Sequence, residues 1–193
     1  MSERFQNKYR IKSARLRNWD YGWNAAYFVT ICTQDRVCFF GYVVNGDMVL
    51  NEIGKIANDC WMEIPEHFPF VKLGNHVVMP NHVHGIVVID KPDDKRNDGQ
   101  NDRYTVETQN FASLPPSSSS PSSKNQFGPQ SKNLASIIRG FKIGVTKNAR
   151  LINPDFAWQP RFHDHIIRND ESFQRISEYI KNNPANWSSD QFR

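Results

Sequence analysis

Two apolar segments in the middle of the chain are separated by only two residues, Pro80 and Asn81. The first segment runs from Val71 to Met79 and the second from His82 to Ile89, and both have the composition of strands. A Pro-Asn pair favours a tight turn. Two strands joined by so short a turn must pair antiparallel, because a parallel pair needs a crossover of a dozen or more residues. The chain therefore folds around an antiparallel sheet.

The other periodic segments place helices and strands around this hairpin. Each is predicted from its apolar spacing and from its cap or turn residues. In chain order they are a strand from Ala26 to Thr33, a small hairpin that turns at Asn45-Gly46-Asp47, a helix from Asn51 to about Pro65, a helix over 134–149, a strand from Arg161 to Arg168, and a final helix that is capped by Asn169 or Asp170 and ends before Pro184. This order predicts an α+β fold, a ferredoxin-like (RRM-like) sandwich: an antiparallel sheet with helices on one face plus an additional C-terminal helix.

Length and composition predict a single domain over residues 1–193. Hydrophobic residues make up 38% of the chain, and no apolar run approaches the roughly 20 residues that span a bilayer. The N-terminus lacks the apolar stretch of a signal peptide, and the three cysteines are an odd number without a C-x-x-C pair. Residues 91–131 end in a Ser/Pro tract and predict a flexible insertion. We therefore expect a cytoplasmic protein with no membrane partner.

Positive charge is concentrated in two segments. Residues 1–19 hold six basic side chains against one acidic, and residues 132–150 hold five basic side chains and no acidic one. At about 100° per residue, the basic side chains of the second segment point away from its apolar stripe. Such patches favour polyanions, because neutralised phosphates release condensed counterions. A solvated helix face beside a basic tail is the alternative interpretation.

His82 and His84 lie at the start of the second strand of the central hairpin, in the sequence PNHVHG. Side chains alternate along a strand, so both imidazoles project from one face while Val83 points to the other. Two imidazoles about 7 Å apart at their Cα atoms can converge on one metal ion. Two half-exposed polar residues at a strand end would show the same spacing, and this alternative stays open.

His163 and His165 repeat the same spacing in the last predicted strand. Four histidines would suit a hydrolase with two zinc ions, but His84 is followed by Gly85-Ile86. The Asp and further His of a dinuclear site are therefore missing. We expect structural polar roles for the second histidine pair.

Tyr179 and Asn183 are four residues apart on the final predicted helix and therefore lie on the same side of it. The apolar stripe of this helix is formed by Phe173, Ile176 and Ile180, and Tyr179 lies at its border. The tyrosine hydroxyl can then point at a site on the sheet while the stripe packs. An amphipathic tyrosine at the border of a packed face is the alternative.

The motif PNHVHG is combined in this chain with a later Y-I-x-x-N-P. With these motifs, and outside residues 91–131, the chain resembles the REP-associated tyrosine transposases, a branch of the single-tyrosine HUH transposases. The segments that carry the resemblance are, in order, YFVTICTQDRVCFFG, LNEIGKIANDCW, IPEHFPFV, VVMPNHVHGIVVI, SIIRGFKIGVTKNAR, HDHIIRND and YIKNNPANW.

This resemblance implies a single HUH transposase domain with Tyr179 as the nucleophile, His82 and His84 as metal ligands and Asn183 as a third ligand. It implies Mg²⁺ or Mn²⁺ as the cofactor. The implied activity is nicking and strand transfer of single-stranded DNA, at hairpin-forming palindromic repeats, through a covalent 5′-phosphotyrosine intermediate. The implied assembly is a homodimer or a monomer.

Basic side chains in the two positive segments are the predicted contacts to the DNA backbone, and nearby aromatic residues are predicted to stack on unpaired bases. Two other functions remain open: a non-catalytic nucleic-acid binder on the same scaffold, and a mononuclear metallohydrolase that acts through water. The predicted backbone contacts are Arg15, Arg17, Arg139, Lys142, Lys147 and Arg150, and the aromatic residues are Trp19, Tyr21 and Trp23.

Overall fold

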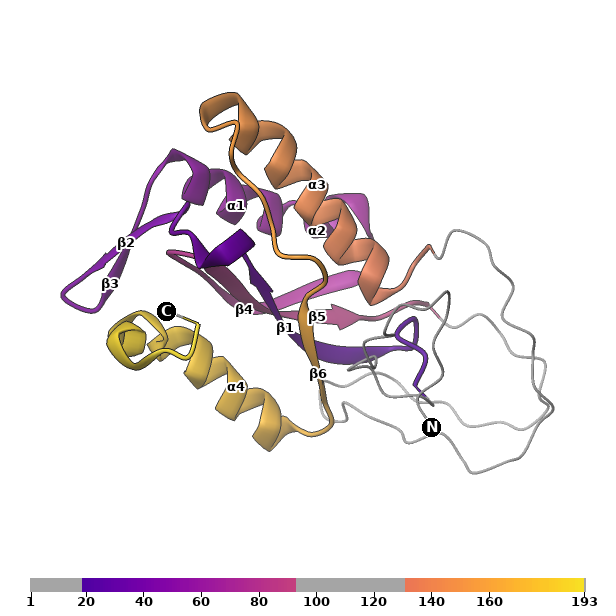
Figure 1. The fold of residues 1–193 in the computed structure, drawn as a ribbon. Helices are drawn as coiled ribbons and strands as arrows, with labels where there is room; N and C mark the ends of the chain where they lie inside the picture. Colours follow the sequence, from indigo (N-terminus) through magenta and orange to yellow (C-terminus); the bar gives the residue numbers. More distant parts are fainter. Residues whose placement is uncertain (1–18, 93–130, 193) are drawn as a thin grey trace, which may run out of the picture.

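The computed structural model describes residues 19–92 and 131–192 (Figure 1). Within these residues, the main sheet has four antiparallel strands in the order β4-β5-β1-β6. Two shorter strands form a separate hairpin, whose turn places Asn45 and Gly46 at positive φ. The strands are β1 (Ala25–Cys32), β2 (Gly41–Val44), β3 (Asp47–Leu50), β4 (Val71–Met79), β5 (His82–Ile89) and β6 (His163–Ile167), and the helices are α1 (Glu52–Met62), α2 (Ile64–His67), α3 (Leu134–Ile152) and α4 (Asp170–Asn182).

Asparagine side chains begin the three longer helices. Asn51 accepts a hydrogen bond from the Gly54 amide at the start of α1, and Asn169 accepts one from Ser172 at the start of α4. Asn133 forms a reciprocal capping box at the start of α3. Each cap satisfies an amide that a helix leaves without an intrahelical partner. The predicted caps Asn51 and Asn169 are confirmed.

The register of the sheet fixes which side chains share a face. In the central hairpin, Met79 pairs with His82 across the Pro80-Asn81 turn. On the other side of β5, His84 pairs with Thr30 of β1. Residues that pair directly across antiparallel strands lie on the same face. His84 and Thr30 therefore lie on the same face of the sheet.

The two faces of the sheet are covered by different helices. Apolar side chains of α1 and α3 pack with Val29 and Val83 into the larger core. On the opposite face, Ile180 of α4 packs with Ala26 and Ile86 in a second apolar cluster. Figure 1 shows α1 and α3 on one side of the sheet and α4 on the other. The predicted ferredoxin-like sandwich with an additional C-terminal helix is confirmed. In the part of the chain that the structure describes, every helix is too short or too polar to cross a bilayer.

Gly85 is required by the packing of Trp61, which is fully buried between the sheet and α3. A Cβ atom on Gly85 would lie 2.2 Å from Cζ2 of Trp61. We expect Gly85→Ala to lower the free energy of unfolding by about 3 kcal/mol, because the indole has no room to move in a packed core. Urea denaturation measures this change.

Gly144→Ala is the matched control for this prediction. Its Cβ would meet only the Cys60 Sγ, at an ordinary contact distance of 3.5 Å. In a helix interior this replacement should raise stability by up to about 1 kcal/mol. An unchanged urea midpoint for Gly85→Ala would contradict the packing argument.

Candidate active site

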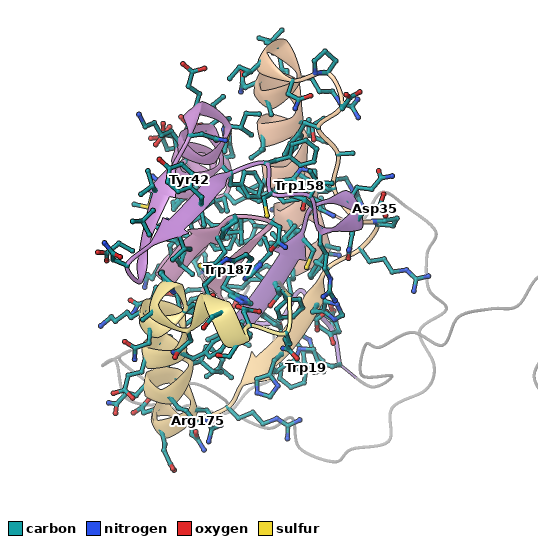
Figure 2. The ribbon with its side chains drawn as sticks, turned by 60° about the vertical axis from the view of Figure 1, so that its left-hand side comes forward. Trp19, Asp35, Tyr42, Trp158, Arg175 and Trp187 are labelled. Atoms are coloured by element: carbon teal, nitrogen blue, oxygen red, sulfur yellow. The ribbon has the colours of Figure 1, made fainter. Side chains whose placement is uncertain are left out.

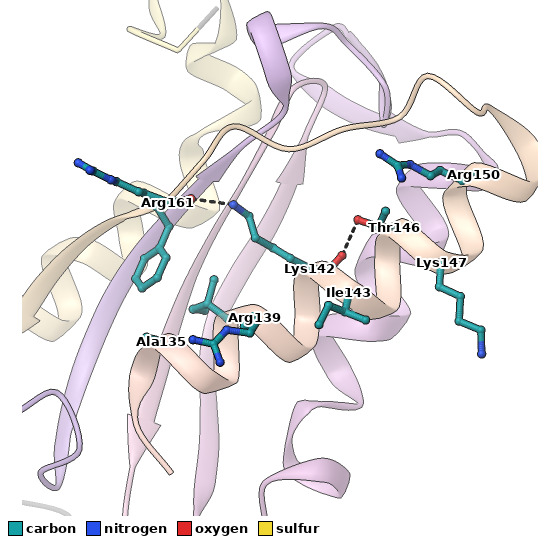
Figure 3. A pocket seen from close by; sticks show the side chains of 10 residues that line it. Ala135, Arg139, Lys142, Ile143, Thr146, Lys147, Arg150 and Arg161 are labelled. Atoms are coloured by element: carbon teal, nitrogen blue, oxygen red, sulfur yellow. Dashed lines mark hydrogen bonds between the residues drawn. The ribbon is translucent and has the colours of Figure 1, made fainter. Parts of the chain in front are cut away.

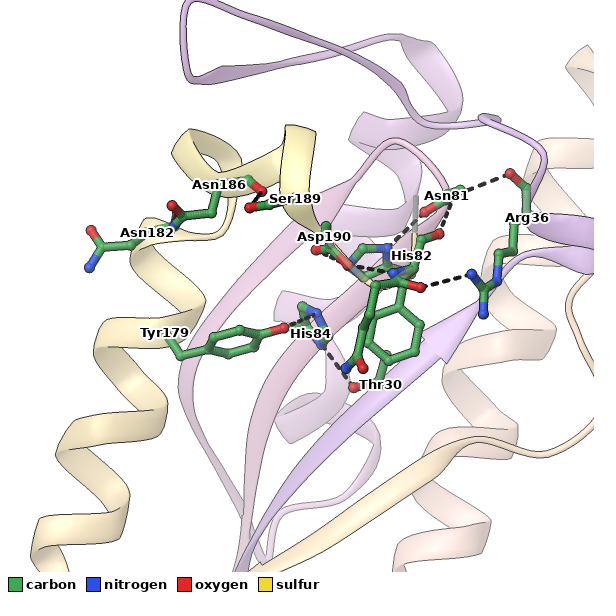
Figure 4. Close-up of polar contacts among 12 residues, drawn as sticks. Thr30, Arg36, Asn81, His82, His84, Tyr179, Asn182, Asn186, Ser189 and Asp190 are labelled. Atoms are coloured by element: carbon green, nitrogen blue, oxygen red, sulfur yellow. Dashed lines mark hydrogen bonds and ion pairs between the residues drawn. The ribbon is translucent and has the colours of Figure 1, made fainter.

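His82 and His84 lie at the start of β5, and both side chains are buried on the face that α4 covers (Figure 4). Their ring centroids are 4.4 Å apart. Val83 points into the larger core on the opposite face, as the alternation along a strand requires. The prediction that the two imidazoles share one face is confirmed.

Asn81 fixes the orientation of the His82 ring. The Asn81 Nδ2 donates hydrogen bonds to the carbonyl oxygens of Arg36, at 3.2 Å, and Phe192, at 2.8 Å. Its Oδ1 is therefore the atom that faces His82 Nδ1, at 2.8 Å. An amide oxygen only accepts, so Nδ1 carries the proton and Nε2 of His82 presents its lone pair to the site. Histidines that bind metals are commonly oriented in this way by a second hydrogen bond.

His84 contacts Thr30 on one side and Tyr179 on the other. Its Nδ1 lies 2.8 Å from the Thr30 hydroxyl, and its Nε2 lies 3.3 Å from the Tyr179 hydroxyl. The ring also stacks on Phe28, with centroids 5.3 Å apart. These contacts hold the imidazole in one plane and direct Nε2 at the tyrosine oxygen.

Tyr179 reaches this position because α4 packs its apolar stripe on the sheet. Ile176 and Ile180 lie against the second apolar cluster, which leaves Tyr179 at the border of the packed face. The side chain is 42% exposed, so its ring is open to solvent on one side. Partial burial of the Tyr179 side chain raises the pKa of its phenol, and the negative charge of Asp190 raises this pKa further. The tyrosine and both histidines belong to one chain.

Asp190 is a residue of the site that the sequence patterns did not indicate. Its Oδ2 lies 3.8 Å from Nε2 of His82, and the side chain is only 3% exposed. The ligand atoms of Asp190, His82 and His84 all lie within 4.8 Å of one another. Asn183, the predicted third ligand, is also buried, and its amide is close enough to affect the pKa values of His82 and Tyr179.

The donor atoms of this cluster fit a cation. Nε2 of His82, Oδ1 of Asn183 and Oδ2 of Asp190 are buried without a hydrogen-bond partner. Buried polar atoms are normally paired, and a metal ion would satisfy all three at once. Burial lowers the pKa of His82 to about 4, although the charge of Asp190 opposes this. Burial likewise places the pKa of His84 well below its usual value. Both imidazoles are therefore neutral, which is the form that binds metals.

The C-terminal segment covers the histidine pair. The ring centroid of Phe192 lies 5.2 Å from that of His82 and 5.6 Å from that of His84. Arg36 donates a hydrogen bond to the carbonyl oxygen of Gln191 at 2.8 Å, which holds this segment in place. Trp187 lies in the short helix Pro184–Ser189 (Figure 2), and its ring centroid is 6.1 Å from that of His82. The residues after α4 therefore belong to the site.

The predicted DNA contacts on α3 lie on the opposite face of the sheet from Tyr179. Arg139, Lys147 and Arg150 are exposed, and with Lys142 they line a cavity of about 600 Å³ (Figure 3). Lys142 differs from the others in being half-buried, and its Nζ donates hydrogen bonds to the carbonyl oxygens of Gln159 and Arg161, each at 2.7 Å. Burial lowers the pKa of Lys142 to about 8. Its ammonium group ties α3 to the segment that leads into β6.

The predictions for the N-terminal segment have different outcomes. Arg15 and Arg17 lie outside the described residues. Tyr21 is 8% exposed and belongs to the larger core, where its ring stacks on Tyr27, so it does not present a face to a base. Trp19 also packs against this core and donates a hydrogen bond to the Tyr27 hydroxyl. The aromatic residues here stabilise the start of β1.

Comparisons with known proteins give relatives for nearly the whole chain. No family model matches. The chain is 38% identical over 182 residues to an uncharacterized protein of Haemophilus influenzae, covering 93% of this chain and 91% of that protein. It is 26% identical over 166 residues to a protein of the same organism described as "Putative REP-associated tyrosine transposase", covering 86% of this chain and 73% of that protein.

A solved structure of a REP-associated tyrosine transposase bound to a REP hairpin matches with a TM-score of 0.55, at 19% sequence identity, over 91% of this chain and 74% of that chain. This match shows a shared fold. The fold and the site define a small α+β protein in which a helical tyrosine faces a histidine pair on an antiparallel sheet. The chain belongs to the same family as the uncharacterized protein of Haemophilus influenzae that is 38% identical to it. It is also similar to the REP-associated tyrosine transposases.

Proposed function

We propose that this protein is a metal-dependent enzyme that nicks single-stranded DNA and transfers the strand through a covalent 5′-phosphotyrosine at Tyr179. Similarity to the REP-associated tyrosine transposases supports a transposase-like function. The observation that carries the finer proposal is the 3.3 Å distance between the Tyr179 hydroxyl and Nε2 of His84 within one chain. A nucleophile and a metal site must lie this close to act on one phosphate.

The proposed metal ligands are His82 and His84, completed by Asp190 and Asn183. Their unpaired, buried donor atoms support this assignment. When bound, Mg²⁺ or Mn²⁺ would polarise the scissile phosphate and stabilise negative charge as the reaction proceeds. Asn81 and Thr30 keep the imidazoles in the orientation that a metal requires.

The proposed attack forms a bond between the Tyr179 Oη and phosphorus and breaks the bond from phosphorus to the 3′ oxygen of the preceding nucleotide. The phenol loses its proton, and the departing oxygen gains one and becomes a free 3′-hydroxyl. The aryl phosphate conserves the energy of the broken bond for a later joining step, so no nucleotide hydrolysis is needed. Because Tyr179 reaches its own histidines, a monomer suffices for the nicking step.

The proposed substrate is single-stranded DNA that contains a hairpin-forming palindromic repeat. The relative with a solved structure is bound to a REP hairpin. The exposed basic residues Arg139, Lys147 and Arg150 support a role in backbone binding, and Arg15 and Arg17 are proposed to share it. A non-catalytic binder of this fold would use exposed aromatic side chains on its central strands. Here the central strands carry the buried pair His82 and His84 instead.

Incubation of the protein with a labelled single-stranded hairpin and Mn²⁺ tests this proposal. We expect a labelled species that survives denaturation and migrates with the protein. Omitting the metal should abolish it, because the phosphate is then not polarised. Cleavage without any such species would contradict the phosphotyrosine intermediate.

Asp190→Asn is expected to weaken Mn²⁺ binding by at least about tenfold, because the variant replaces a buried anionic ligand by a neutral amide. Asn183→Ala should have a smaller effect, since it removes a neutral donor. Titration calorimetry measures both affinities. Asp155→Asn is the control, because Asp155 is exposed and is not part of the cluster. An unchanged affinity in Asp190→Asn would exclude Asp190 as a ligand.

A further inference from the structure

β6 is an edge of the main sheet, since within the described residues it pairs only with β1. The strand carries His163 and His165, both exposed. His163 pairs with Thr30, which also pairs with His84 on its other side. Paired residues share a face, so His163 and His84 lie on the same face, about 10 Å apart by two strand spacings. The exposed edge of β6 therefore continues the surface of the candidate active site.

A hollow with basic walls lies at each end of β6. The cavity beside α3 has five basic lining residues and no acidic one, and it includes Arg161, which precedes the strand. The Arg161 side chain extends away from α3, as Figure 3 shows. A second cavity, of about 530 Å³, is lined by His165 and by two arginines, Arg168 and Arg175. Arg175 projects from the first half of α4 (Figure 2).

Between Arg161 and Arg168, the acidic residue Asp164 does not interrupt the row of exposed basic and imidazole side chains. Asp164 lines the second cavity, but it is half-buried on the other face of β6 and interacts within the protein. Asp170 and Glu171 lie in the first turn of α4 and line neither cavity. From Arg161 to Arg168, the exposed ionisable side chains on the β6 edge are all basic or imidazole groups.

We propose that the edge of β6, from Arg161 to Arg168, binds the phosphate backbone of the substrate strand and guides it between the candidate active site and the basic cavity beside α3. This inference rests on the proposed function and extends it, because it connects two sites that lie on opposite faces of the sheet. A polynucleotide suits this surface, since its phosphates repeat along the chain and match a row of cations. Arg161 and Arg168 are the principal contacts.

Binding of a fluorescein-labelled single strand that contains a hairpin, measured by anisotropy without divalent metal, tests the proposal. The test variant combines Arg161→Asn and Arg168→Gln. Asparagine is chosen because residue 161 has a φ of 71°, a conformation that asparagine tolerates. The control combines Lys55→Gln and Lys72→Gln, which removes the same charge from α1 and from β4 at the opposite edge of the sheet.

The test variant is expected to lose at least about tenfold in affinity at ~0.1 M salt, and its dependence of log K on log salt should flatten by about 1.4 for two lost phosphate contacts. The control should stay within about twofold of the wild type. Restoring charge with Arg161→Lys and Arg168→Lys should recover most of the affinity. Circular dichroism of each variant verifies that it is folded.

Equal binding by the test variant and the wild type would overturn the proposal that the edge of β6 binds the DNA backbone. An equal loss of affinity in the control would also overturn it. These results are separate from the proposed function, because the assay contains no metal and involves no cleavage. If the wild type forms the tyrosine adduct and the test variant binds normally, the proposed function is supported and DNA binding by the edge of β6 is refuted. If the test variant binds DNA more weakly and the wild type forms no adduct, DNA binding by the edge of β6 is supported and the phosphotyrosine chemistry is refuted.

Discussion

Replacing His84 with alanine is expected to abolish Mn²⁺-dependent cleavage of a single-stranded hairpin and to leave hairpin binding in place. The replacement removes one of the two proposed imidazole ligands and the atom that faces the Tyr179 hydroxyl. Cleavage should fall by at least about 10²–10³-fold, because the charge that develops on the phosphate is no longer stabilised. A gel assay of the cleaved strand measures cleavage, and the anisotropy of a labelled hairpin measures binding.

His67→Ala is the control for this variant, because His67 is exposed at the end of α2 and lies outside the metal-ligand cluster. It should bind Mn²⁺ and cleave at the wild-type rate. Normal cleavage by His84→Ala would show that the histidine pair is structural. Loss of hairpin binding in His84→Ala would indicate that the pair contributes to DNA binding rather than to catalysis.

Replacing Tyr179 with phenylalanine is expected to eliminate the covalent adduct and to lower cleavage by at least about 10⁴-fold, because the proposed nucleophile is lost. The ring remains, so its edge contact with Phe28 and the packing of α4 are preserved. Mn²⁺ affinity and hairpin affinity should stay within about twofold of the wild type, because Tyr179 is not a proposed ligand. A denaturing gel with labelled DNA measures the adduct.

Tyr42→Phe is the matched control, since Tyr42 is exposed on the separate β2–β3 hairpin. It should form the adduct normally. Persistent cleavage by Tyr179→Phe would favour a metallohydrolase that activates water, with the tyrosine as a bystander. The pair of variants at His84 and Tyr179 therefore separates the contribution of the proposed metal site from that of the proposed nucleophile.

Local sequence signals predicted most of the fold and several of the residues that meet at the candidate site. The hairpin around Pro80-Asn81 was predictable because a two-residue connection leaves antiparallel pairing as the only option. The shared face of His82 and His84 follows from strand alternation alone. Tyr179 was predictable from the border of an apolar stripe, because that stripe determines how α4 turns toward the sheet.

Other parts of the site depend on contacts between distant segments. Asp190 follows α4 in a segment without apolar periodicity, and only the folded chain brings it to His82. The sequence indicates Asn81 only as a turn residue, whereas its amide also orients the His82 ring. Helical spacing places Lys142 with the exposed cations of α3, but two carbonyl oxygens from the segment before β6 accept hydrogen bonds from its ammonium group. Residue spacing along one element carries no information about such partners.

The most direct measurement is the identification of the residue that carries the nucleotide after the wild type reacts with a single-stranded hairpin and Mn²⁺. Proteolysis of the reaction product and tandem mass spectrometry locate the attached phosphate. A nucleotide linked to the peptide that contains Tyr179, with its mass shift on the tyrosine itself, is the predicted result. A nucleotide on any other side chain, or cleaved DNA with no modified peptide, would contradict the proposed mechanism.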